Sequence, residues 1–165
     1  MTPFQKKHTI LAGTLLGAAF FISLLSMVLF PQPLSRRVLF FPNGVTGELD
    51  GEEHYIPRRP EQEEAITLFV KELILGPKTL GSIRVLPLRT EIEMLLLRNG
   101  ELLIDFSPEI LDVERDLSIS FGDVLEMTEY NIRYNFPRVK KITITVAGQL
   151  PRTPRYVPYT VGNNR

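Results

Sequence analysis

One long apolar stretch opens the chain, and shorter segments with alternating apolar and polar residues follow it. Residues 9–30 contain no charged side chain over 22 positions. A helix of this length, at about 1.5 Å per residue, spans roughly 33 Å, close to the bilayer core of about 30 Å. The pattern therefore predicts a transmembrane helix at 9–30, preceded by a cytoplasmic tail at 1–8.

A cleaved signal peptide is the alternative interpretation of this stretch, because Gly17-Ala18-Ala19 resembles a small-residue cleavage site. Cleavage there leaves a mature chain that begins at Phe20 with a fully apolar segment, so the sequence favours retention. Basic residues at 6–7 and 36–37 flank the helix almost equally. Since the N-terminal side is only a short tail, we expect a single-pass protein of the cytoplasmic (inner) membrane, with its N-terminus inside and its C-terminal domain extracytoplasmic.

Gly13 and Gly17 give this helix a face of small residues, on which a second helix can approach closely. Glycine is also common in membrane helices that do not associate. The sequence thus predicts a candidate homo-oligomer contact through Gly13 and Gly17, and other envelope or membrane proteins as further partners.

The segments after the anchor predict two strands and a helix. A proline-containing linker is expected at 31–35, a strand at 37–41, a Gly- and acid-rich loop at 45–53 and a short edge strand at 54–57. A helix is predicted at 60–75. Apolar residues recur at helical spacing along it and should face the core: Ile66, Phe69, Val70, Leu73 and Ile74.

A hairpin is predicted across Asn99-Gly100, a dipeptide typical of the type I′ turn, between strands at 90–98 and 101–106. Alternation places one apolar set on a common face: Ile92, Met94, Leu96, Leu102, Ile104 and Phe106.

The last third of the chain predicts a helix at 116–135, a strand at 139–146 and a disordered, basic, proline-rich tail at 151–165. The start of the helix is left open, because Asp116, Ser118 and Ser120 are all suitable caps. Apolar and small residues form a stripe along the helix: Leu117, Phe121, Val124, Leu125, Thr128 and Ile132. In the strand, Ile142, Ile144 and Val146 should face inward, and Lys141, Thr143 and Thr145 should face water. The fold class is α+β: two helices packed on one face of a small mixed or antiparallel sheet, plus the N-terminal transmembrane helix.

Composition excludes several chemistries. Cysteine is absent, which removes disulfides and thiolate catalysis. The formal net charge is zero, so no overall field attracts nucleic acid. A catalytic zinc site needs about three protein ligands, but His8 borders the apolar helix and leaves only His54 for the domain. We expect His54 to be a solvated surface residue.

Acidic residues between 105 and 114 are the remaining candidates for catalysis. Asp105, Glu109, Asp112 and Glu114 include enough carboxyl groups for a glycosidase pair. However, alternation points Asp105 away from the core, just before a turn that it can cap. The sequence therefore predicts a protein that is not an enzyme and has no catalytic, metal or cofactor site.

The order of elements resembles the GerMN domain, which is named for a spore-germination and sporulation protein. The resemblance covers residues 38–149 and is carried by LILGP at 73–77, LIDFS at 103–107 and NFPRVKK at 135–141. It implies an envelope domain of the ring-building type, with the order helix-strand-strand-helix-strand, that associates with other proteins near peptidoglycan synthesis or remodelling.

Three features depart from that family. The founding protein is similar to a lipoprotein with two copies of the domain, whereas one copy follows a predicted membrane helix here. Asn131-Ile132 replaces a common Thr-Leu, and Arg138 replaces a usual glycine, so a left-handed turn is not expected there. Since such domains are also present in bacteria that never sporulate, spore biology is not inferred.

Two functions remain open: a module that docks on envelope proteins, or a module that binds cell-wall glycan or peptide, with peptidoglycan as its ligand. Exposed aromatic residues flanked by polar groups are typical of the second. The candidates are Tyr130, Tyr134, Tyr156 and Tyr159.

Overall fold

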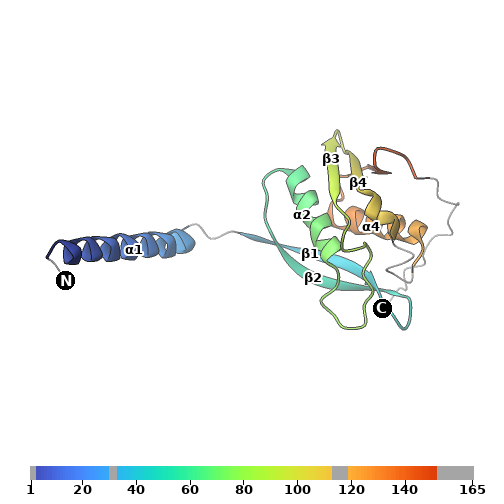
Figure 1. Ribbon diagram of the computed structural model, residues 1–165. Coiled ribbons are helices and arrows are strands. Elements are labelled where there is room, and N and C mark those ends of the chain that lie inside the picture. The colour runs from blue at the N-terminus through green and yellow to red at the C-terminus, as the bar shows by residue number, and fades with distance from the viewer. Residues whose placement is uncertain (1–2, 30–32, 113–118, 152–165) are drawn as a thin grey trace. The chain divides into compact units, whose positions relative to one another are not determined.

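The computed structural model describes the backbone of residues 3–29, 33–112 and 119–151 (Figure 1). In the first range it describes the side chains of residues 12–26 and 29. The chain divides into two compact units, Met1–Pro33 and Leu34–Arg165. Some predictions lie outside the described residues: the helix start at 116–118 with Leu117, Glu114, and the tail at 152–165 with Tyr156 and Tyr159.

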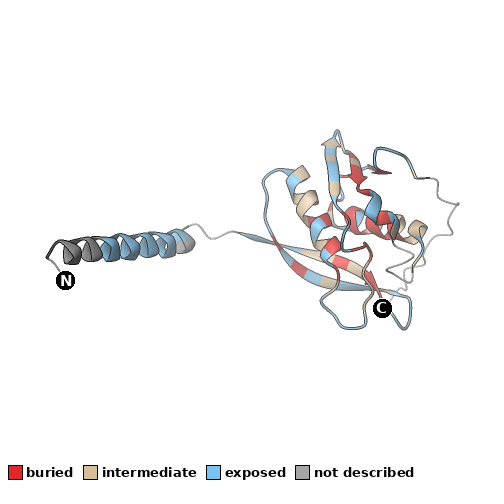
Figure 2. Cartoon of the chain, viewed as in Figure 1, coloured by how far each residue is buried: buried red, intermediate tan, exposed pale blue. Residues whose placement is uncertain are grey.

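Helix α1 (Pro3–Leu29) makes up the first unit and has 27 residues. Its described side chains are all exposed (Figure 2). A Cβ added at Gly13 or Gly17 would meet no atom within 4 Å. Over the described residues, no helix combines the length and the apolar character needed to cross a membrane. The transmembrane helix at 9–30 stays a prediction.

A two-stranded antiparallel sheet opens the second unit. Strand β1 (Leu34–Pro42) pairs with β2 (Leu49–Pro57) along its whole length. The prediction of a loop at 45–53 is therefore wrong from residue 49 on, and the expected linker residues 34–35 belong to β1. Gly51 lies opposite Phe40, where a Cβ would approach the phenyl ring to 3.1 Å, so glycine here makes room for a large neighbour rather than ending the strand.

Helix α2 (Gln62–Leu75) confirms the predicted core stripe, since all five of its expected residues are buried. It contacts both β2 and the third strand, β3 (Ile92–Arg98). The helix ends at Gly76, whose φ of 90° is readily adopted only by glycine.

The second sheet has the order β3-β4-β5, with β4 at Glu101–Phe106 and β5 at Lys141–Val146. The predicted hairpin is confirmed: β3 and β4 are antiparallel, and Asn99 and Gly100 have φ of 53° and 82°. Strand β5 is parallel to β4.

The predicted inner face of β3 is wrong after Ile92. The pairing register shifts between Ile92 and Met94, and such a bulge moves every later side chain to the other face. Met94 and Leu96 are therefore exposed, while Leu95 and Leu97 pack against the core. The expected residues of β4, Leu102, Ile104 and Phe106, are buried as predicted. In β5, Thr145 is buried although the sequence places it toward water.

Helix α4 (Phe121–Asn135) follows a short 3₁₀ helix, η1 (Pro108–Asp112). Ser120, one of the three caps that the sequence offers, caps α4: the Ser120 hydroxyl accepts from the amide of Asp123, whose carboxylate accepts from the Ser120 amide. Along α4, Val124, Thr128 and Ile132 are buried as expected.

The structure confirms the α+β class but not a single sheet. Within the described residues there are two small sheets and three α-helices, one of which is α1. One continuous apolar core joins both sheets with α2 and α4, as the buried residues in Figure 2 show.

Candidate functional site

Two asparagine side chains on α4 complete the outer edge of β1. Asn131 Oδ1 accepts from the amide of Phe40 at 2.8 Å, and Asn131 Nδ2 donates to the Phe40 carbonyl at 3.0 Å. Asn135 repeats the pattern on Val38, at 3.1 and 2.6 Å. Since residues four apart lie on one helix face, the two carboxamides bond this edge as a neighbouring strand would.

This asparagine ladder, formed by Asn131 and Asn135, places Phe40 against two tyrosine rings of α4. Phe40 lies edge-on to Tyr130 and Tyr134, with centroid distances of 5.1 and 4.7 Å and interplanar angles near a right angle, 76° and 75°. The two tyrosine rings are 6.4 Å apart. Tyr134 is 56% exposed. We call Phe40, Tyr130 and Tyr134 the aromatic surface.

Charged groups flank the aromatic surface. Arg36 forms an ion pair with Glu53 on the neighbouring strand. The hydrogen bond to Glu53 and the charge of Glu53 raise the pKa of Arg36. Tyr55 and Tyr134 raise the same pKa by smaller amounts. Arg37 lies 4.4 Å from the ring centre of Phe136 and donates to the Asn135 carbonyl at 2.7 Å, which further fixes β1 on α4.

The structure therefore brings together two of the four predicted tyrosines. It adds Phe40, which sequence reasoning assigned only to a bulky strand. Alternation along β1 is the signal that could have identified Phe40. Leu39 and Phe41 are fully buried, so Phe40 between them must face outward.

The prediction that His54 is a solvated surface residue is wrong. Its side chain is 1% exposed, with Nδ1 at 2.9 Å from Glu72 Oε1 and Nε2 at 3.3 Å from Glu52 Oε2. Both ring nitrogens are therefore engaged, Nδ1 by Glu72 of α2 and Nε2 by Glu52 within β2. Across the residues that the structure describes, no three His, Cys, Asp or Glu side chains form a group that could hold a metal ion.

Glu52 extends this cluster to the chain after α2. Its carboxylate accepts from the amides of Lys78 at 2.9 Å and Thr79 at 3.1 Å. Burial raises the pKa of Glu52, but the hydrogen bonds from Lys78, Thr79 and His54 together outweigh burial and lower it. The charged carboxylate thus stabilises the fold.

We expect Glu52→Gln to lower the free energy of unfolding by about 1–3 kcal/mol at pH 7, since charge-assisted hydrogen bonds are lost. A carboxyl group whose folded pKa is lowered stabilises the fold above its unfolded pKa of about 4.3, and this contribution disappears as the pH falls through the folded pKa. Urea unfolding from pH 7 to pH 2.5 should therefore show the gap between wild type and variant closing in acid. A difference in unfolding free energy that stays constant over this pH range contradicts the role given to the Glu52 carboxylate. Glu101→Gln, at an exposed position, serves as the control.

The acidic candidates Asp105, Glu109 and Asp112 are each engaged by other groups of the domain. Asp105 is buried, contrary to the outward position predicted for it, because its Oδ1 accepts from Thr145 Oγ1 at 2.6 Å and from the Gly148 amide at 2.9 Å. It therefore caps the turn after β5. Asp112 forms an ion pair with Arg89 at 3.2 Å. A hydrogen bond from Ser107 lowers the pKa of the exposed Glu109.

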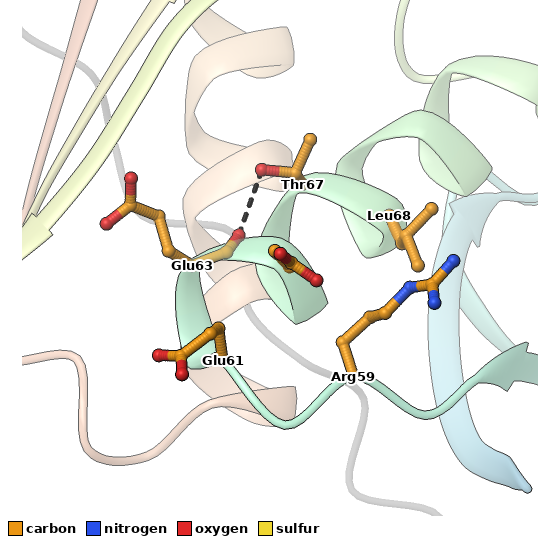
Figure 3. Close-up of a pocket in the computed structure, with 6 residues that line it drawn as sticks. Arg59, Glu61, Glu63, Thr67 and Leu68 are labelled. Atoms are coloured by element: carbon orange, nitrogen blue, oxygen red, sulfur yellow. Dashed lines mark hydrogen bonds between the residues drawn. The ribbon is translucent and has the colours of Figure 1, made fainter.

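A hollow of about 530 Å³ at the start of α2 is drawn in Figure 3. The Glu61 and Glu63 carboxylates point away from the Arg59 guanidinium. Glu63 also has a structural role, because its carboxylate accepts from the amide of Leu97 at the edge of β3 at 3.3 Å.

These features define an α+β domain whose described polar groups serve mainly to join its elements. No protein-family model and no curated protein matches the chain. It is similar to the solved tandem GerMN domains of the sporulation protein GerM from Bacillus subtilis, with 18% identity over 73% of this chain and 41% of that chain, and a TM-score of 0.57. The first GerMN domain of the same protein matches with 17% identity over 71% of this chain and 86% of that chain, and a TM-score of 0.49.

The domain therefore has a GerMN-like fold, and this chain spans less than half of the tandem structure. Two departures from the family pattern have structural outcomes. Asn131, at the position of a common threonine, builds the asparagine ladder. Arg138, before β5, does not have a positive φ, as the sequence predicts.

Proposed function

We propose that this chain is a non-catalytic, membrane-anchored interaction module of the bacterial cell envelope, and that another envelope protein docks on its aromatic surface. The observation that carries the proposal is the cluster of the half-buried Phe40 and Tyr130 with the exposed Tyr134, in which the asparagine ladder fixes the backbone of Phe40. Rigid tyrosine rings bury much area at little cost in conformational entropy and are enriched at protein interfaces.

The anchoring part of the proposal is supported by the uncharged stretch at 9–30 and by the helical backbone of α1. The domain then lies outside the cytoplasm, near peptidoglycan synthesis or remodelling. The non-catalytic part is supported by His54, whose two nitrogens are both engaged by glutamates.

A second candidate function is binding of cell-wall glycan. It is favoured by Tyr134, which lies near enough to Arg36 of the Arg36–Glu53 ion pair to affect its pKa, because sugars offer apolar faces to rings and hydroxyl groups to charged side chains.

Placing a photo-crosslinking amino acid at Tyr134 of the full chain, in native membranes, distinguishes these functions. We expect a discrete crosslinked protein from position 134 and none from the exposed control position Leu88. Adding Tyr130→Ser should reduce the yield about tenfold or more, because truncation of an interface anchor typically costs about 2 kcal/mol.

Sedimentation of the detergent-solubilised chain with purified sacculi completes the test. Binding to sacculi that is lost in a Tyr130→Ser, Tyr134→Ser variant, without a protein crosslink, would favour the glycan function instead. If position 134 gives no crosslink and sacculi do not bind, neither function belongs to the aromatic surface.

A further inference from the structure

The outer edge of β2 is a row of backbone groups without a partner among the described residues. In the β1–β2 hairpin, the Asn43 amide donates to the Glu48 carbonyl, so these two opposite residues form a hydrogen-bonded pair. By alternation, the bonded residues of β2 are the even ones, 50 to 56. The amides and carbonyls of Gly51, Glu53 and Tyr55 therefore point away from β1, and all three residues are exposed.

The outer edges of β1 and β3 are covered, at least in part, by side chains or loops. The asparagine ladder bonds Val38 and Phe40 at the outer edge of β1, and the amide of Ile83 bonds the Pro42 carbonyl. At β3, Glu63 bonds the amide of Leu97. An edge that is left open can take up an additional strand, which gains main-chain hydrogen bonds along its length.

The charge of β2 indicates which strand fits. The strand carries three carboxylates, Asp50, Glu52 and Glu53, and no lysine or arginine. Pairing of two copies through β2 would place these acidic residues against one another, which is unfavourable. We propose that the outer edge of β2 accepts an extended, basic peptide segment of an envelope partner, as a third strand of the β1–β2 sheet. This inference rests on the proposed role as an interaction module but concerns a different surface.

The test uses the full chain in lipid nanodiscs and a synthetic peptide with alternating valine and lysine or arginine, Ac-VKVRVKV-NH₂. Its acidic counterpart, Ac-VEVDVEV-NH₂, is the matched control. We expect the basic peptide alone to bind, and to slow hydrogen exchange of the amides at 51, 53 and 55 about tenfold or more at saturation. Binding should weaken as salt is raised.

Tyr55 offers a matched pair of variants. Its backbone does not bond β1, so Tyr55→Pro removes one outward donor without removing a hydrogen bond of the hairpin. Tyr55→Ala removes the same ring but keeps the donor. We expect Tyr55→Pro to weaken peptide binding about tenfold beyond Tyr55→Ala. If Tyr55→Pro does not fold, Glu53→Lys provides the second test. It reverses an exposed charge and also breaks the ion pair with Arg36, so it should weaken binding of the basic peptide and favour binding of the acidic one.

Several results would overturn the inference. Equal binding of both peptides, or unchanged binding by Tyr55→Pro, would show that strand addition does not occur. Slow exchange of the β2 amides in the absence of peptide would show that another segment already occupies the edge. That segment would be the basic residues 152–165 if their deletion abolishes the protection. It would be a second copy of the chain if the protection rises with protein concentration. Because crosslinking at Tyr134 reports a different surface, a failure here leaves the proposed function standing.

Discussion

Replacing Asn131 by leucine is expected to lower the free energy of unfolding by about 2–5 kcal/mol, because the variant leaves buried backbone groups of Phe40 without hydrogen-bond partners, at about 1–3 kcal/mol each. Asn131 is fully buried, so water cannot replace its carboxamide without a local rearrangement. For a domain of about 115 residues, such a loss corresponds to a fall in Tm of roughly 10–20 °C. Thermal unfolding followed by circular dichroism measures it.

Two further variants separate the hydrogen bonds from the packing. Asn131→Asp keeps the shape and the acceptor but removes the donor that bonds the Phe40 carbonyl, and it too should be strongly destabilising. Glu129→Ala removes only a surface contact with Arg133, so we expect a change within about 0.5 kcal/mol. If Asn131→Leu were as stable as wild type, the ladder would not be what holds β1 on α4.

The aromatic surface should respond to the same change. Asn131 fixes the backbone of Phe40, and Phe40 contacts both tyrosines of the surface. A loosened ladder would therefore also disorder the rings, which is why a functional study should change the tyrosines themselves and leave Asn131 intact.

Elements governed by short-range patterns were predictable from the sequence. All five residues of the α2 stripe recur at helical spacing, and each is buried. The Asn99-Gly100 turn was predictable for the same reason, since the positive φ of both residues is a local property of the dipeptide. Neither prediction required knowledge of the rest of the fold.

Elements that depend on partners distant in the sequence were predicted less well. The acidic, Gly-containing segment of β2 favours a loop by composition, but its pairing with β1 satisfies the strand, and Phe40 covers the glycine. The bulge after Ile92 reverses the faces of β3 and leaves no simple mark in the alternation. In both cases tertiary context outweighs local preference.

The candidate site lay mostly beyond sequence reasoning. Asn131 meets Phe40 across 91 residues of chain, and no local pattern relates the two. One signal was present: Asn131 follows Thr128 by three positions and so lies on the core face of α4, where a polar side chain requires a partner. His54 gave a similar signal, because in β2 it lies on the same face as Ile56, which is buried.

Replacing Leu16 and Phe20 together by arginine is expected to remove the chain from membranes. The twelve Leu, Ile, Val and Phe residues at 9–30 favour insertion by roughly 4–7 kcal/mol, at about 0.3–0.6 kcal/mol each. Two arginines near the middle of a span oppose it by about 5–7 kcal/mol in total, so the balance is lost. Extraction of membranes with alkaline carbonate, followed by immunoblotting of pellet and supernatant, measures the result.

The double variant Leu16→Ala, Phe20→Ala is the matched control for this prediction. It removes the same side chains without adding charge, so the uncharged stretch stays long enough to span and the protein should remain in the pellet. Intact mass measurement should find residues 1–29 still attached to the domain. A mature chain that begins at Phe20, or a wild-type protein released by carbonate, would contradict membrane anchoring. Neither result would contradict the proposals for the aromatic surface or for the β2 edge.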